Sequence, residues 1–264
     1  MKFAIVGDPV DHSLSPEIHN AAFAHFGIDA RYERLPTARD SFARVVEALR
    51  SGDLDGVNVT MPHKGSAYEA VDSLSEAARR THAVNTIVRQ DGRLAGDNTD
   101  VEGVRHSRGL LGLVDTPCVV LGTGGAARAA IVACADREVT VMARHPDRAT
   151  AALEACAVHG GVVEWGVPVE RAILINATPI GMHREMLPTA MLEAAAGLID
   201  MVYDSEPTPA VTWAVREGMP VADGIDMLIG QAAAAFEVFT GRAAPIDVMI
   251  AAARAERSPD PRHP

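Results

Sequence analysis

The sequence has few cysteines and lacks a long apolar segment. Its three cysteines, Cys118, Cys134 and Cys156, are too few for a disulfide framework and lack the spacing of metal ligands. We interpret them as reduced thiols in the core. No apolar run approaches the ~20 residues that span a bilayer, and residues 1–7 are typical of a short strand rather than of a signal peptide. These absences predict a cytoplasmic protein without a membrane partner.

The sequence also lacks a cluster of basic residues. Its formal net charge is -11, from 24 Lys and Arg against 35 Asp and Glu. Because nucleic acids are bound through clustered Lys and Arg, this balance argues against a nucleic-acid partner. An anionic small molecule must therefore be bound by a local site.

The first hundred residues alternate between strand and helix patterns. Helices are expected from Ser15-Pro16 and around 42–49, where apolar positions share one helical face. Strands are expected at 3–6, 31–35, 56–60, 83–88 and 93–95. The last two strands are predicted to pair across an Asp91-Gly92 turn. This pattern predicts one α/β unit.

A second α/β pattern follows a helix expected at about 99–111. Short apolar runs at 118–121, 139–142, 173–175 and 198–202 are separated by helical segments, which predicts a parallel, doubly wound sheet. Two Ala-rich helices, at about 225–240 and 245–255, are expected to return to the first unit. Residues 257–264 are rich in Pro and charge and are expected to be disordered. We therefore predict one domain from 1–101 with 224–264, and a second from 102–223.

A glycine-rich turn begins at Gly122, where an apolar strand leads into an Ala-rich helix. Gly122, Gly124 and Ala127 have the dinucleotide-binding spacing, in which the backbone approaches a pyrophosphate at a helix N-terminus. The turn alone is weak evidence, because glycines also cap ordinary helices. The next strand ends without an acidic residue, and Arg144 and Arg148 follow it. Arginines suit the extra phosphate of NADP, so NADP is favoured over NAD, and the alternative is that both are solvated residues at a helix start.

Two motifs offer a proton-transfer pair and a carboxylate site. Lys64 ends the segment NVTMPHK (58–64), and Asp100 ends GDNTD (96–100). An ammonium and a carboxylate brought together can exchange the proton of a substrate hydroxyl. Outside such motifs, each would be an ordinary surface or helix-terminal charge. Ser13 and Ser15 precede a helix that begins with proline, so they are expected either to bind a carboxylate or, for Ser15, to act as a plain N-cap.

These motifs together resemble the shikimate dehydrogenase family over nearly the whole chain. The matching segments are SLSP (13–16), NVT (58–60) with Lys64, AVNT (83–86), NTD (98–100), GTGG (122–125), NATPIGM (176–182), DMVY (200–203) and the segment from Gly224 to Gln231. The resemblance implies a substrate domain, a Rossmann-like NADP domain, and NADP-dependent reversible reduction of 3-dehydroshikimate to shikimate in chorismate and aromatic amino acid biosynthesis.

The resemblance also implies roles for individual residues. Lys64 would be the acid/base with Asp100, and Ser13 and Ser15 would bind the shikimate carboxylate. Ring hydroxyls would be contacted by Thr60, Asn85, Asp100 and Gln231, and Tyr203 would lie near the carboxylate and the nicotinamide. The implied cofactor residues are Gly122, Thr123, Gly124, Gly125 and Ala126 at the pyrophosphate, Arg144 and Arg148 at the 2′-phosphate, and Glu76, Thr178, Met201 and Gly224 elsewhere on the cofactor.

One departure and several alternatives remain. The family's NADP-binding strand tip usually reads Asn-Arg-Thr, whereas Ala143 and His145 flank Arg144 here, so NAD remains an alternative cofactor. A quinate or aminoshikimate dehydrogenase, or a non-catalytic NADP- or ligand-sensing relative, would share the same skeleton. Either a monomer or a homodimer fits. No ligand set for a metal is complete, and His12, His19 and His63 are interpreted as hydrogen-bonding scaffold residues.

Overall fold

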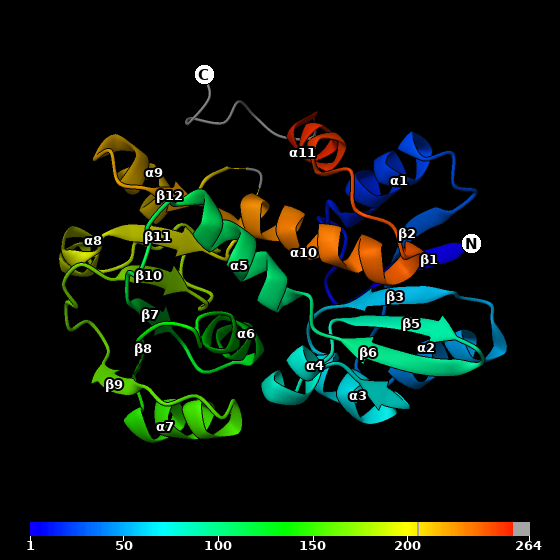
Figure 1. Ribbon diagram of the computed structural model, residues 1–264, viewed down its shortest axis with the longest axis horizontal. Helices are drawn as coiled ribbons and strands as arrows, with labels where there is room; N and C mark the ends of the chain where they lie inside the picture. The colour runs from blue at the N-terminus through cyan, green and yellow to red at the C-terminus, as the bar shows by residue number, and fades with distance from the viewer. Residues whose placement is uncertain (205, 256–264) are drawn as a thin grey trace. The chain divides into compact units, whose positions relative to one another are not determined.

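The computed structural model describes residues 1–204 and 206–255 and is drawn in Figure 1. These residues form two compact units, the first from Met1–Thr99 with 231–255 and the second from Asp100–Gly230. The domain limits inferred from the sequence remain predictions. The tail at 257–264, expected to be disordered, lies outside the described residues. Within the described ranges, no helix is both long and apolar enough to cross a membrane.

The sheet of the first unit is mixed. Its strands are β1 (Lys2–Gly7), β2 (Arg31–Pro36), β3 (Gly56–Val59), β4 (Ser73–Leu74), β5 (Thr86–Gln90) and β6 (Arg93–Asp97). They lie in the order β2-β1-β3-β5-β6-β4, and β5 is antiparallel to both of its neighbours. Asp91 and Gly92 link β5 to β6 with φ values of 50° and 77°, which confirms the predicted turn.

Helices cover both faces of this sheet (Figure 1). They are α1 (Ser15–His25), α2 (Phe42–Ser51), α3 (Lys64–Ala70), α4 (Glu76–Thr81), α10 (Gly224–Thr240) and α11 (Ile246–Ala255). One face packs its aliphatic side chains against α2, α3 and α4. On the other face, Phe3 lies 4.6 Å from Phe239 of α10 between ring centroids, and α11 contacts α1. This packing confirms that the C-terminal helices return to the first unit.

The second unit is built on a fully parallel sheet. Its strands are β7 (Cys118–Leu121), β8 (Val139–Ala143), β9 (Gly161–Glu164), β10 (Ile173–Asn176), β11 (Gly197–Asp200) and β12 (Val221–Ala222), in the order β12-β11-β10-β7-β8-β9. Its helices are α5 (Asp100–Leu110), α6 (Gly125–Ala133), α7 (Pro146–Ala155), α8 (Thr189–Ala194) and α9 (Pro209–Arg216). The strand order reverses between β7 and β10, which confirms the predicted doubly wound sheet.

Several local predictions were wrong at strand ends. β11 stops at Asp200 rather than at 202, because the Asp200 carboxylate accepts the Val202 amide at 3.2 Å and turns the chain. β5 begins at Thr86 rather than at 83, because the Val84 amide donates to the Lys64 carbonyl at 3.0 Å instead of joining a ladder. The elements that were not predicted, α3, α4, β4, β9 and β12, are mostly very short and depend on tertiary packing.

Candidate active site

The predicted substrate residues of the first unit gather at one edge of its sheet. The carboxyl ends of β1, β3 and β6 meet there, and antiparallel β5 brings its amino end to the same edge. Thr60 follows β3 and Asn85 precedes β5. The Val59 amide donates to the Asn85 carbonyl at 2.7 Å, and the Asn85 amide donates to the Asp97 carbonyl at 2.9 Å. The edge therefore brings together Thr60 and Asn85, which are distant in the sequence.

A serine loop follows β1 at this edge. The Ser13 hydroxyl donates to Ser15 Oγ at 3.1 Å, and both side chains are buried. The Ser13 carbonyl accepts from Arg34 Nε at 3.0 Å and from Nη2 at 2.6 Å, while Nη2 also lies 2.7 Å from Glu17 Oε1. Leu14 occupies the N-cap position of α1, and no side chain caps this helix. The plain N-cap interpretation of Ser15 is therefore wrong, and its hydroxyl belongs to the loop.

Lys64 is the first residue of α3 and is half-buried. The turn before it is held by the Thr60 amide, which donates to the Val6 carbonyl at 2.9 Å. His63 Nε2 lies 2.8 Å from the Thr37 carbonyl oxygen, so its scaffold role is confirmed. Gly7 packs against this turn, where a Cβ atom would overlap Thr60 Cγ2.

His19 differs from its predicted role. Its ring stacks on Tyr32 with centroids 4.5 Å apart and planes 5° apart. Neither ring nitrogen has a hydrogen-bond partner among the described residues. Burial lowers the pKa of His19 to about 3, so the ring is neutral. The hydrogen-bonding interpretation is wrong, because aromatic side chains from α1, β2 and α10 surround this position.

Three further predicted residues, two for the substrate and Glu76 for the cofactor, lie on helices. Gln231 is buried in α10, and Glu76 is exposed at the start of α4. Asp100 is the buried first residue of α5. Lys64 belongs to the first unit and Asp100 to the second, so their pairing remains a prediction.

The glycine turn after β7 has room for a phosphate group. Gly122 has a φ of 107°, and a Cβ atom there would lie 3.2 Å from the Ala177 carbonyl oxygen. Gly124 is the N-cap of α6 without a side-chain cap, and a Cβ atom at Gly124 or Gly125 would meet no atom within 4 Å. Thr123 and Ala126 are half-buried. Open backbone and uncapped amides at a helix N-terminus fit a pyrophosphate.

A polar cluster surrounds Thr178, which follows β10. β10 and β7, which precedes the glycine turn, are the two strands between which the strand order reverses. Thr178 Oγ1 donates to Asn176 Oδ1 at 2.6 Å, and Asn176 Nδ2 donates to Asp200 Oδ1 at 2.9 Å. Burial raises the pKa of Asp200 above its usual value, and the Thr208 hydroxyl, which donates at 2.6 Å, opposes that shift. Sequence reasoning gave Asn176 and Asp200 no role of their own. The available signal was a polar residue at the last position of each apolar strand.

Arg144 directly follows β8, and Arg148 lies in the first turn of α7, as the sequence pattern predicts. Both are exposed, and neither guanidinium forms an ion pair with another residue in the described part of the chain. The arrangement is compatible with an anion site and with a solvated pair.

Met201 and Gly224 lie on the segment after β11 and at the start of α10. The Met201 amide donates to the Asn176 carbonyl at 3.0 Å. A Cβ atom at Gly224 would overlap the Val202 carbonyl and lie 2.7 Å from Tyr203 Cβ. Only glycine therefore allows α10 to begin beside Tyr203, which is itself exposed.

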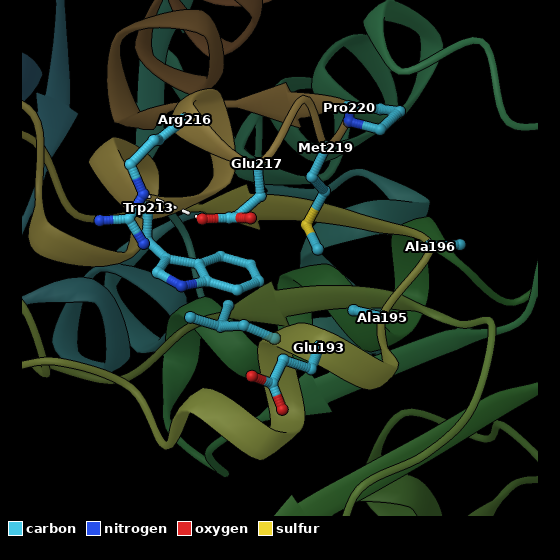
Figure 2. Close-up of a pocket in the computed structure, with 9 residues that line it drawn as sticks. Glu193, Ala195, Ala196, Trp213, Arg216, Glu217, Met219 and Pro220 are labelled. Carbon is cyan, nitrogen blue, oxygen red and sulfur yellow. Dashed lines mark hydrogen bonds and ion pairs between the residues drawn. The ribbon is translucent and has the colours of Figure 1, made fainter.

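A surface pocket of about 510 Å³ lies elsewhere in the second unit, lined by residues of α8 and α9 and of the segments that follow them (Figure 2). Its wall includes Trp213 and Glu193, and Arg216 Nε pairs with Glu217 Oε1 at 2.9 Å. None of the predicted site residues lines it, so volume alone does not identify the functional site. Among the described residues, no group of three His, Cys, Asp or Glu is arranged for a metal ion.

Two family models match parts of the chain. Residues 5–87 match the shikimate dehydrogenase substrate binding domain, and residues 224–254 match the shikimate 5'-dehydrogenase C-terminal domain. A shikimate dehydrogenase (NADP(+)) from Salinibacter ruber is 37% identical over 274 residues, covering 96% of each protein.

Solved structures extend this likeness to the fold. The shikimate 5-dehydrogenase of Thermus thermophilus, solved with NADP(H) and shikimate, has a TM-score of 0.86 and 34% identity, covering 97% of this chain and 99% of its own. A 5-ketofructose reductase of a Gluconobacter species has a TM-score of 0.85 at 25% identity, covering 97% and 98%. From its identity to the Salinibacter protein over almost its full length, the chain belongs to the shikimate dehydrogenase family.

Proposed function

We propose that this protein catalyses the reversible, NADP-dependent reduction of 3-dehydroshikimate to shikimate, a step of aromatic amino acid biosynthesis. The observation that carries the proposal is the single sheet edge at which the serine loop, the Thr60 to Lys64 turn and Asn85 converge. Two serine hydroxyls, on a segment whose Ser13 carbonyl is held by Arg34, and a lysine at a helix start suit a substrate with one carboxylate and several hydroxyls.

Lys64 is the proposed acid/base. During reduction it gives a proton to the ketone oxygen, and during oxidation it takes the proton from the hydroxyl. Asp100 orients the same oxygen and the ammonium. Ser13 and Ser15 hold the carboxylate, while Thr60, Asn85 and Gln231 contact ring hydroxyls. Tyr203 lies near the carboxylate.

The second unit is the proposed NADP domain, and NADP when bound supplies or accepts the hydride. The backbone from Gly122 to Ala126 cradles the pyrophosphate, which is supported by the open, uncapped start of α6. Arg144 and Arg148 hold the 2′-phosphate. Glu76, Thr178, Met201 and Gly224 contact the rest of the cofactor.

A second candidate is a reductase of another polyhydroxy ketone. It is favoured by the Gluconobacter 5-ketofructose reductase, which shares the fold over nearly the whole chain. The paired serines support the shikimate assignment, because a neutral sugar has no carboxylate for them to bind.

The test is a steady-state assay at the reduced nicotinamide absorbance band. Shikimate, quinate, an aminoshikimate analogue and a ketohexose, the product of reducing 5-ketofructose at one ketone, are each offered with NADP and with NAD. Fast turnover of shikimate with NADP is expected. Preference for another substrate would replace the assignment, and NADP binding without any turnover would favour a sensor. We place the enzyme in the cytoplasm as a monomer or homodimer, which sedimentation would distinguish.

A further inference from the structure

A buried chain of hydrogen bonds lies behind Asn85 in the first unit. The Tyr32 hydroxyl donates to Asn58 Oδ1 at 2.7 Å, and Asn58 Nδ2 donates to Thr86 Oγ1 at 2.9 Å. The Thr86 hydroxyl then donates to Asn85 Oδ1 at 2.9 Å. All four side chains are buried, with exposed fractions between 0% and 4%. The chain therefore begins in the core at Tyr32, beside His19, and ends at the sheet edge.

The orientation of Asn58 is set by the Asn85 carbonyl, which can only accept and lies 3.4 Å from Asn58 Nδ2. A tyrosine hydroxyl has one proton, and an asparagine amide has one accepting and one donating end. With Tyr32 donating to the oxygen of Asn58, the amide nitrogen of Asn58 faces Thr86. Thr86 Oγ1 accepts that hydrogen bond and donates its own proton to Asn85 Oδ1 at 2.9 Å, while the Thr99 hydroxyl lies 3.2 Å from Thr86 Oγ1. Each link fixes the orientation of the next one.

A backbone amide fixes the last link independently. The Thr99 N–H donates to Asn85 Oδ1 at 2.8 Å, and the Thr99 hydroxyl also lies 3.1 Å from the same oxygen. A backbone N–H can only donate, so the atom facing it must be the amide oxygen. Flipping Asn85 would set its NH₂ group against the Thr99 N–H in a buried site, where unpaired donors are costly.

We propose that Asn58 and Thr86 are positioning residues that hold the side-chain oxygen of Asn85 inward, so that Asn85 can offer the substrate only an N–H donor. This inference rests on the proposed function for the identity of the ligand. Its consequence is chemical: the substrate atom that meets Asn85 is an accepting oxygen. A protonated amine at that place has only donors and is rejected.

The first experiment compares Thr86→Val with Thr86→Ser. Thr86→Val removes the hydroxyl at nearly constant shape and is expected to raise the KM for shikimate about tenfold, with kcat changed less than about twofold, because one ordering hydrogen bond is lost. Thr86→Ser keeps the hydroxyl and should restore the wild-type KM. Thr140→Val, the same change on β8 of the second unit, is the matched control and should leave the KM for shikimate unchanged.

A double-mutant cycle separates positioning from general stability. If Thr86 acts through Asn85, Thr86→Val has no further effect on KM once Asn85→Ala has removed the amide. Full additivity of the two KM effects would overturn the proposal, as would an unchanged KM in Thr86→Val. If Thr86→Val does not fold, Tyr32→Phe, which deletes only the first proton of the chain, is measured against Tyr68→Phe.

An activity-independent measurement keeps this inference apart from the proposed function. A trans-hydrogen-bond scalar coupling between the Thr99 amide nitrogen and Asn85 Cγ is expected in the NMR spectrum of the wild-type protein, with or without substrate. Its absence overturns the amide orientation even if shikimate is turned over. Its presence in a protein that does not turn over shikimate keeps the orientation and removes only the assigned ligand.

Discussion

The Ser13 hydroxyl donates to Ser15 Oγ over 3.1 Å, while Arg34 holds the carbonyl of Ser13 and the carboxylate of Glu17. These contacts order the two hydroxyls before any ligand binds. Ser13 itself precedes the helix. Ordering before binding lowers the entropic cost of capturing a ligand.

Replacing either serine should therefore weaken substrate binding more than turnover. Ser13→Ala and Ser15→Ala are each expected to raise the KM for shikimate about 10- to 100-fold, since a hydrogen bond to a charged carboxylate is lost. Initial-rate kinetics measures this effect. Ser41→Ala, at a partly exposed serine whose hydroxyl bonds only to Asp40 in the described structure, is the control. An unchanged KM in both loop variants would remove the carboxylate assignment.

Lys64→Ala should remove turnover and keep binding. General acid/base catalysis contributes about 100- to 10,000-fold, so kcat should fall by that range while the dissociation constant for shikimate changes little. The sequence contains only two lysines, Lys2 and Lys64, so Lys2→Ala is the control for the loss of a lysine outside the proposed site. Single-turnover kinetics and calorimetry separate the two quantities. Near-normal kcat in Lys64→Ala would contradict the assignment.

Alanine substitutions at two glycines of the turn after β7 should have different effects. Gly122→Ala places a Cβ atom 3.2 Å from the Ala177 carbonyl at a φ of 107°, so it should lower the Tm and NADP affinity together. Gly124→Ala meets no protein atom within 4 Å, so it should keep the Tm and raise only the KM for NADP. Thermal denaturation and kinetics measure both. Unaltered NADP kinetics in Gly124→Ala would argue against a phosphate at this turn.

Arg144→Ala and Arg148→Ala test the choice of cofactor. If the guanidinium groups bind a 2′-phosphate, each variant should raise the KM for NADP about tenfold or more and leave the KM for NAD unchanged. Arg105→Ala, at an exposed arginine paired with Glu102, should change neither value. Equal effects on NADP and NAD would favour the solvated-pair interpretation.

His19 predicts how stability depends on pH. The pKa of His19 is 6.5 in the unfolded chain and about 3 in the folded protein, because the folded protein buries the ring. Between these values the unfolded chain binds the proton and the folded chain does not. The contribution of neutral His19 to the free energy of unfolding is therefore fully present above pH 6.5. It is lost as the pH falls toward 3, by up to about 1.4 kcal/mol per pH unit.

His19→Leu should remove this contribution and, by replacing two unbonded nitrogens, should stabilise the protein. Urea denaturation at several pH values between 4 and 7 measures the slope. His25→Leu, at an exposed position at the end of α1, should keep the wild-type slope. A variant at His19 that retains the full acid sensitivity would show that other groups cause it.

Much of the architecture could be predicted because its signals are local. The apolar runs that became β7, β8 and β10 and the Asp91-Gly92 turn depend on residues close together in the sequence. The same is true of the glycine turn at Gly122, whose conformation only glycine adopts easily. Short elements such as α3 and β12 could not be predicted, because neighbours far along the chain stabilise them.

The sequence by itself determined the order of the main strands and helices, the parallel class of the second sheet, and the motifs that mark the chain's family. Only the tertiary structure decided that His19 is an unbonded ring on Tyr32 and that the Ser15 hydroxyl accepts from Ser13, whose carbonyl Arg34 holds. It also decided which way the Asn85 amide faces. The reason is that hydrogen bonds and stacking act over a few ångströms in space, between residues that the sequence separates by a dozen positions or more.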